Sequence, residues 1–423
     1  MDIDARFRKK VLIMDVQKRN FIIIMFTNFL VAGSTTMIMP FLSLYIESLG
    51  DFSDEYVQRW AGLVFGVTFV AALFMSPIWG RIADRFGYKP ILIINGFGIA
   101  FSIYLMGTAD SVQELFMIRL FMGVVTGFIP TSLAFVSTQT PKETAGKTLG
   151  TLQMGSVSGT LFGPVIGGLM ADSFGFDYTF IITAVVIGIA ASLVVIGIKE
   201  TKKVSNKDAH VYAPKTIIQG ILHHRLLINV MIITSLIQVG NFSIQPLLSL
   251  YVAELTVDSS QVAFLAGVTF SAAGVGNLLF ARRWGRLGDS IGYEKVLGFL
   301  LLLSFLFIVP QAFVTDLWQL ILLRLLFGIA VGGMIPTTTA LMRREAPVEI
   351  QGEIMGYNTS FRFLGNIVGP VFGGIVSGFI GISSVFIVTG VLFVLAFVFL
   401  RYTLAKPDQD FEDVLLEQEM KSM

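Results

Sequence analysis

Apolar residues run through this chain in long stretches, such as residues 21–44, 181–198 and 385–400. A helix needs about 20 apolar residues to cross the hydrocarbon core of a bilayer. Twelve such stretches, separated by charged residues or turn signals, predict twelve membrane-spanning helices. They cover roughly residues 20–46, 60–80, 90–108, 114–137, 147–171, 178–198, 226–252, 261–281, 296–314, 317–341, 354–377 and 383–401. No small-residue cleavage site follows the first stretch, so we expect it to be retained.

The positive charges lie almost entirely on one side of these predicted helices. Of the 30 lysines and arginines, 26 fall before the first span, after the last one, or in the loops that follow even-numbered spans. Because cytoplasmic loops are enriched in basic residues, this asymmetry predicts that both termini are cytoplasmic. The absence of cysteine excludes disulfides, thiol catalysis and cysteine metal sites. The net charge of +1 indicates no nucleic-acid partner.

Several segments of the first half recur about 205 residues later, in the same order. "WGRIADRFGYKPIL" (79–92) matches "WGRLGDSIGYEKVL" (284–297), and "PFLSLYIE" (40–47) matches "PLLSLYVAE" (246–254). "RLFMGVVTGFIPT" (119–131) matches "RLLFGIAVGGMIPT" (324–337), and "GPVIGG" (163–168) matches "GPVFGG" (369–374). The chain is therefore predicted to be a duplication of six spans, with both halves in the same orientation. We expect an N-terminal bundle at 1–198, a cytoplasmic linker at 199–225 and a C-terminal bundle with its tail at 226–423.

The loop after the second span carries a pattern of glycine and charge. It consists of Gly80, Asp84, Arg85, Gly87 and Lys89. This pattern resembles the signature G-x-x-x-D-R/K-x-G-R-K/R of the major facilitator superfamily, although Tyr88 stands where that family has a basic residue. The copy in the second half is looser and keeps Gly285, Asp289 and Gly292, with Lys295 one position late. Ser290, Tyr293 and Glu294 fill its basic positions.

This motif allows two interpretations, a gate formed by its aspartates or a signal that only fixes topology. Gly87 and Gly292 can adopt the positive φ that ends a helix tightly. The resemblance implies that Asp84 docks onto the start of span eleven, and Asp289 onto that of span five, as a gate. The simpler alternative is that the motif only fixes topology through its positive charge.

The fifth predicted span has glycines on one helix face and a proline. The set is Gly155, Gly159, Gly163, Pro164, Gly167 and Gly168. Glycines four residues apart allow two helix backbones to approach closely, and helix packing is all that the spacing itself indicates. The segment also resembles the G-x-x-x-G-P-x-x-G-G motif of drug:proton antiporters with twelve spans. That resemblance implies an exporter.

Three arginines fall within predicted spans, where a charge is costly. Arg119 and Arg324 lie near the outer ends of their spans, where their side chains could snorkel to the surface. Arg119 resembles the arginine of span four in the family, with Met122 in place of the usual glutamine, and Glu114 lies close by in sequence. Arg362 lies near mid-depth and is expected to face protein or a water-filled cavity. Glu114, Arg119 and Arg362 are the candidates for coupling transport to protons, with structural ion pairing as the alternative.

The resemblance places spans one, four, seven and ten around a central pathway. Candidate lining residues in these spans are Asn28, Met37, Phe128, Gln238, Asn241, Gln245 and Met334. Methionine and aromatic side chains can repack around apolar ligands of different shapes. Residues of these types also pack helices or face lipid, so both interpretations remain open.

These observations predict an all-α membrane protein with twelve helices in two six-helix bundles related by pseudo-two-fold symmetry. The resemblance further implies proton-driven efflux of amphipathic drugs, expected to be cationic or zwitterionic, or of other small organic molecules across a bacterial cytoplasmic membrane, as in antibiotic resistance. Its expected partners are the substrate and the lipid bilayer, with the protein as a monomer and with no enzyme activity, metal or other cofactor. "PKETAGKT" (141–148) lacks the first glycine of a phosphate-binding loop, which argues against ATP-driven transport. The alternatives are a transporter of a single metabolite and a sensor on the same fold.

Overall fold

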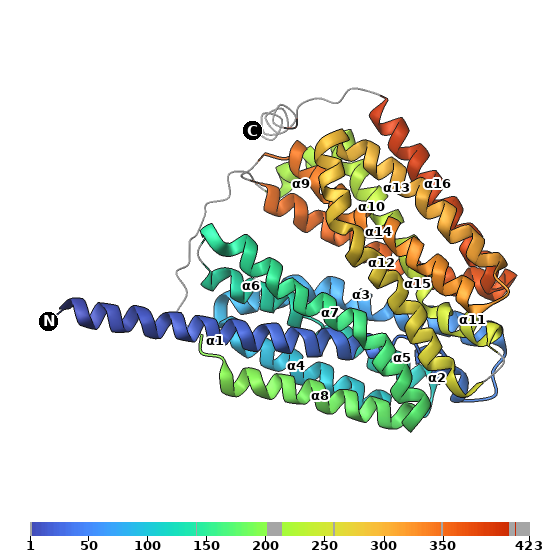
Figure 1. Cartoon of the computed structure of the whole chain (residues 1–423), viewed down its shortest axis with the longest axis horizontal. Helices are drawn as coiled ribbons and strands as arrows, with labels where there is room; N and C mark the ends of the chain where they lie inside the picture. Colours follow the sequence, from blue (N-terminus) through green and yellow to red (C-terminus); the bar gives the residue numbers. More distant parts are fainter. Residues whose placement is uncertain are drawn as a thin grey trace. The chain divides into compact units, whose positions relative to one another are not determined.

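The computed structural model describes residues 2–140, 142–200, 214–256, 259–347, 350–405 and 411. Within these ranges the regular structure is entirely helical, with no strand (Figure 1). Twelve stretches are long and apolar enough to cross a membrane, from Val16–Met37 to Ile382–Leu404. The prediction of an all-α membrane protein with twelve transmembrane helices is therefore confirmed.

The helices of the two halves follow similar orders. In the first half they are α1 (Asp2–Met37), α2 (Leu42–Ser48), α3 (Asp54–Phe86), α4 (Tyr88–Met106), α5 (Val112–Val125), α6 (Phe128–Gln139), α7 (Lys142–Phe174) and α8 (Phe176–Gly197). In the second half they are α9 (Pro214–His223), α10 (Arg225–Ser243), η1 (Gln245–Leu247), α11 (Leu248–Leu255), η2 (Ser259–Gln261), α12 (Val262–Ile291), α13 (Tyr293–Ile308), η3 (Val309–Phe313), α14 (Leu317–Glu345), α15 (Gln351–Ile380) and α16 (Ile382–Leu404).

Three predicted spans are interrupted in the structure, a feature that the sequence analysis did not anticipate. The first breaks between α1 and α2 around Pro40, and the seventh breaks between α10 and α11 around Pro246. Proline has no N–H to donate and clashes with the preceding turn, which favours a break at these two positions. The fourth span breaks between Val125 and Phe128, whereas its repeat partner α14 runs without interruption.

The short helices after the first two breaks are fixed by equivalent tyrosines. The hydroxyl of Tyr45 on α2 donates a 2.8 Å hydrogen bond to the carbonyl of Met106 at the end of α4. The hydroxyl of Tyr251 on α11 donates a 2.8 Å hydrogen bond to the carbonyl of Gln311. The sequence repeat thus extends to its tertiary contacts.

Four glycines make the tightest reversals between helices. Gly87, Gly175, Gly292 and Gly381 have φ values of 100°, 84°, 96° and 84°. Each is the single residue between two long helices. A side chain is strained at positive φ, so glycine is favoured there. The predicted role of Gly87 and Gly292 is confirmed, and the sequence analysis missed the other two.

The contacts divide the chain into two units. Unit 1 comprises Met1–Asp51, Val67–Ser205 and Asp258–Ser271, and unit 2 comprises Phe52–Gly66, Asn206–Val257 and Ala272–Met423. In unit 1, α1 packs along α7 and α8, and α4 packs on α8. In unit 2, α10 packs along α15 and α16, and α13 packs on α14 and α16. Both α3 and α12 are shared between the units. Residues 201–213 of the predicted linker and most of the tail after 405 lie outside the described residues, and the predicted domain boundaries stay predictions.

Candidate functional site

Both copies of the glycine and charge motif hold their aspartate in the same way. Oδ1 of Asp84 at the end of α3 accepts a 2.9 Å hydrogen bond from the hydroxyl of Tyr88, the first residue of α4. In unit 2 the hydroxyl of Tyr293, the first residue of α13, donates to Oδ1 of Asp289. These tyrosines occupy positions where the family signature has a basic residue. The departure from the signature therefore has a structural role that the sequence analysis missed.

In unit 1 the motif lysine takes part in a reciprocal cap. The carboxylate of Glu200 accepts hydrogen bonds from the backbone N–H groups of Tyr88 (2.9 Å) and Lys89 (3.0 Å). In return, Nζ of Lys89 donates to the carbonyl oxygens of Val195 and Ile198, each at 2.8 Å. Helix ends carry unpaired N–H or C=O groups with partial charges of opposite sign. Glu200 and Lys89 satisfy both kinds and join the start of α4 to the end of α8.

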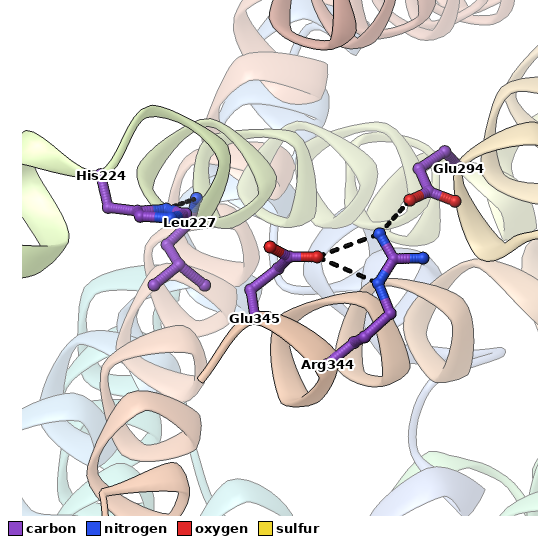
Figure 2. A network of polar contacts seen from close by, with 5 residues as sticks. All are labelled: His224, Leu227, Glu294, Arg344 and Glu345. Carbon is purple, nitrogen blue, oxygen red and sulfur yellow. Dashed lines mark hydrogen bonds and ion pairs between the residues drawn. The ribbon is translucent and has the colours of Figure 1, made fainter. Parts of the chain in front are cut away.

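Unit 2 has an ion-pair network at the equivalent place (Figure 2). Glu294 lies 205 residues after Lys89 and reverses its charge. Its carboxylate pairs with the guanidinium of Arg344, in the last turn of α14, which also pairs with Glu345 at 3.0 Å. In the same view, Nδ1 of His224 accepts a 3.3 Å hydrogen bond from the N–H of Leu227 and caps α10. The acidic residue in a basic position of the motif thus has a specific partner.

The predicted docking of Asp84 and Asp289 onto the starts of spans eleven and five stays a prediction. In unit 1, however, the structure shows the same kind of contact at the other end of α7. The carboxylate of Asp172 accepts hydrogen bonds from the N–H groups of Ala263 (3.2 Å) and Phe264 (2.7 Å), in the first turn of α12. A carboxylate is stabilised at a helix N-terminus by the unpaired N–H groups and the helix dipole. Asp172 therefore holds the start of α12 against α7.

The glycine face of the fifth span packs on the first span. A Cβ atom on Gly155, Gly159, Gly163 or Gly167 would collide with the backbone of α1, at Met25, Phe29, Gly33 and Met37 respectively. In unit 2, Gly365, Gly369 and Gly373 of α15 lie in the same way against α10. Gly168 lies against Ala263 of α12. The packing role indicated by the spacing is present in the structure, and the exporter role stays a prediction.

The two arginines near the outer ends do not snorkel, so that expectation was wrong. Arg119 is 3% exposed and Arg324 is 5% exposed. The Nη1 atom of Arg119 lies 3.6 Å from the sulfur of Met122, the residue that replaces the usual glutamine of the family. The guanidinium of Arg324 lies 5.6 Å from the centre of the Phe386 ring, a distance that permits a cation–π interaction. Neighbouring helices surround these side chains, which the sequence distance to the helix end does not reveal.

Glu114, the candidate coupling carboxylate, forms part of a helix cap. Its Oε2 atom accepts a 3.1 Å hydrogen bond from the N–H of Asp110, and its own N–H donates to Ser111 at 3.2 Å. This reciprocal pattern begins α5 and leaves the Glu114 side chain exposed. Its role in coupling stays a prediction.

Arg362 has polar neighbours on one face of α15. Asn358, Arg362 and Asn366 are spaced four residues apart, so they form a polar stripe along that face. Oδ1 of Asn358, Nε of Arg362 and Oδ1 of Asn366 are buried without a hydrogen-bond partner among the described residues. An arginine near the bilayer centre costs about 2.5–3.5 kcal/mol on insertion scales, which calls for a compensating interaction. The sequence analysis missed Asn366, although its spacing from Arg362 was visible.

The candidate pathway residues differ in exposure. Asn28, Phe128 and Met37 are buried in unit 1, where Oδ1 of Asn28 accepts a 2.8 Å hydrogen bond from Ser132. In unit 2, Met334 and Gln238 are buried, whereas Asn241 and Gln245 are partly exposed. Their place in a substrate pathway stays a prediction. Among the described residues, no group of three or more histidine, aspartate or glutamate side chains could hold a metal ion.

Comparison with known proteins finds a matching family model and several similar proteins. The family model of the Major Facilitator Superfamily matches residues 24–277 and 230–415. YuxJ of Bacillus subtilis (strain 168), described as an uncharacterized MFS-type transporter, is 55% identical over 368 residues, covering 86% of this chain and 93% of YuxJ. The multidrug resistance protein MdtG of Salmonella typhimurium is 41% identical over 374 residues, covering 88% of this chain and 92% of MdtG.

Solved transporter structures share the fold. A bacterial homolog of the human lysosomal transporter Spinster superposes with a TM-score of 0.77 at 14% identity, covering 92% of this chain and 97% of that chain. The nucleoside transporter NupG superposes with a TM-score of 0.74 at 14% identity, covering 92% of this chain and all of that chain (100%). At this level of identity the likeness concerns the fold alone.

Proposed function

The chain belongs to the Major Facilitator Superfamily and is a membrane transporter of that type, and from this premise we propose that it exports amphipathic small molecules. The observation that carries the proposal is the 41% identity, over 88% of this chain, to a protein named for multidrug resistance. The close packing of α7 on α1 through Gly155, Gly159, Gly163 and Gly167 is consistent with the motif that suggests export. Resistance to antibiotics would be one consequence of such export.

We propose the proton gradient as the driving force, with proton antiport and alternating access. A duplication of six helices is typical of secondary transporters that work by alternating access, which requires no nucleotide-binding domain. We place the protein in a bacterial cytoplasmic membrane with both termini inside, because of the basic excess on that side. The proposed partners are the transported molecule and the lipid bilayer, without nucleic acid, and the proposed unit of function is a monomer.

Everted membrane vesicles test this function directly. Vesicles with the protein should accumulate a lipophilic fluorescent dye when respiration energises them, and an uncoupler should abolish the accumulation. Vesicles without the protein are the control. If no dye of a chemically varied panel accumulates, multidrug export is excluded and transport of a single metabolite becomes the better hypothesis. Accumulation that is insensitive to the uncoupler would exclude proton coupling.

The orientation needs a separate measurement, for which the absence of cysteine is an advantage. A single Thr144→Cys lies on the predicted cytoplasmic side, and a single Asp51→Cys lies on the opposite side. An impermeant thiol reagent should label the first only in everted vesicles and the second only in right-side-out vesicles. The reverse pattern would overturn the proposed orientation.

A further inference from the structure

The polar stripe of α15 lies in the middle part of a helix that is long and apolar enough to cross a membrane. Arg362 is the twelfth residue of α15, so it lies about 17 Å along the helix at 1.5 Å per residue. The stripe from Asn358 to Asn366 spans about 12 Å by the same measure. A hydrocarbon core about 30 Å thick places Arg362 and Asn366 well within the membrane.

The polar atoms of the stripe have unused hydrogen-bonding capacity. Asn358 is 3% exposed, yet its Oδ1 atom has no hydrogen-bond partner among the described residues. Oδ1 of Asn366 and Nε of Arg362 are also buried without a hydrogen-bond partner among the described residues. Buried polar groups in proteins are nearly always paired, so three unpaired ones on a single helix face indicate a missing partner. The Arg362 side chain is only partly buried, which leaves it accessible to such a partner.

The helix that packs along α15 offers Arg362 no counter-ion. Over its length from Arg225 to Ser243, α10 has no aspartate or glutamate. The only acidic residue of α15 is Glu353, nine positions and about 13 Å before Arg362 along the helix. These two helices therefore present a positive charge with no carboxylate beside it.

The fold does not require this stripe, because the other half of the duplication lacks it. With "GPVFGG" aligned on "GPVIGG", the equivalents of Asn358, Arg362 and Asn366 are Leu152, Ser156 and Thr160 of α7. These residues carry no charge, and α7 packs on α1 through its glycines as α15 packs on α10. At these aligned positions, only the second half of the duplication carries a charge.

We propose that Asn358, Arg362 and Asn366 bind the acidic group of the transported molecule. The planar guanidinium group of Arg362 can donate two parallel hydrogen bonds to a carboxylate or an equivalent oxyanion. The two asparagine oxygens, one helical turn to either side, accept hydrogen bonds from N–H or O–H groups beside the acid. The transported class is therefore amphipathic acids with an adjacent hydrogen-bond donor. This inference rests on the proposed export function and names its substrate class.

Two probes that differ only at the acid make the test specific. Dansylglycine has a carboxylate next to a sulfonamide N–H, and dansylglycinamide replaces that carboxylate by a neutral amide. Fluorescence titration of the full-length protein in nanodiscs measures the Kd of each. We expect the acid to bind at least tenfold more tightly than the amide. Equal affinity for the two probes, or binding of neither, overturns the proposal.

Substitutions then locate the binding to the stripe. Arg362→Gln should raise the Kd of the acid at least tenfold and change the Kd of the amide less than twofold. Arg362→Lys keeps the charge but lacks the planar guanidinium group, so it should give an intermediate rise in the Kd of the acid. Asn366→Leu should raise the Kd of the acid about threefold. Thr359→Val, on an exposed face of the same helix, is the matched control and should leave both Kd values within twofold. An acid Kd within twofold of wild type in both Arg362 variants overturns the proposal.

Transport of the same probes separates this inference from the function on which it rests. In everted vesicles, uptake of both probes at equal rates would preserve the export function and overturn the acid site. Selective uptake of the acid, lost in Arg362→Gln, supports both. Retained amide binding by Arg362→Gln verifies that this variant is folded. If that binding is lost, the Kd of the acid for Arg362→Lys is the measurement that decides on the acid site.

Discussion

The indole N–H of Trp79 on α3 donates a 2.7 Å hydrogen bond to the carbonyl oxygen of Val124 on α5. The second half repeats this contact, with Trp284 on α12 and the carbonyl of Ile329 on α14 at 2.7 Å. Donor and acceptor are 45 residues apart in both cases. Val124 lies in the last turn of α5, where carbonyl groups have no partner within the helix. Trp79 therefore stabilises the point at which the fourth span breaks.

Replacing Trp79 by phenylalanine should destabilise the protein through this bond. A hydrogen bond in a protein contributes about 1 kcal/mol net, and the loss of packing adds to it. We expect Trp79→Phe to lower the thermal unfolding midpoint in detergent by a few degrees. Trp318→Phe, at a position that is 64% exposed, is the matched control and should have no effect. Equal midpoints for the two variants would show that the Trp79 bond does not contribute.

Close packing of α7 on α1 gives a second prediction, with a control on the same helix. A Cβ atom on Gly159 would collide with the carbonyl of Phe29, whereas one on Gly150 would meet nothing within 4 Å. We expect Gly159→Ala to cost about 1–3 kcal/mol, as overpacking usually does. Gly150→Ala should instead stabilise the helix by about 0.5–1 kcal/mol, because alanine loses less backbone entropy. Unfolding midpoints of the two variants, measured side by side, check the opposite signs.

The sequence predicted the number of spans and the duplication, because apolar runs and repeated motifs are local features. It did not predict the breaks around Pro40 and Pro246, since the apolar stretches continue through both. The hydrogen-bond partners of Trp79 and Glu200 could not be predicted from the sequence either, because these contacts join residues 45 and more than 100 positions apart. Burial of Arg119 depends on neighbouring helices, which hydropathy along one span does not describe.

The cap formed by Lys89 gives a third prediction. Its Nζ atom donates to two carbonyls at the end of α8, whereas the side chain of Lys295 in the second half is exposed and has no hydrogen bond or ion pair with another described residue. Lys89→Ala should therefore speed hydrogen exchange at the end of α8 and lower stability by about 0.5–1.5 kcal/mol. Lys295→Ala should change neither quantity at its own site. Unchanged exchange in Lys89→Ala would contradict a stabilising role for this cap.

The last prediction separates the charge of Asp84 from its hydrogen bond with Tyr88. Asp84→Asn keeps an oxygen that can accept from the tyrosine hydroxyl and removes the negative charge. Tyr88→Phe removes that hydroxyl and keeps the charge. If Asp84 docks onto a helix N-terminus during transport, its charge contributes typically about 0.3–1 kcal/mol, and up to about 2 when partly buried. A difference of this size shifts a balanced two-state equilibrium several-fold.

We therefore expect Asp84→Asn to reduce dye transport several-fold at normal membrane abundance, and Tyr88→Phe to have a smaller effect. A single Asn241→Cys in each background reports the conformational equilibrium through its rate of modification from the cytoplasmic side, which should rise in Asp84→Asn. Asp51→Asn, an exposed acid between α2 and α3, is the control for loss of charge alone. Full transport and an unchanged modification rate in Asp84→Asn would leave the motif with topology as its only role. A larger loss in Tyr88→Phe than in Asp84→Asn would instead assign the effect to the tyrosine, because only that variant removes its hydroxyl.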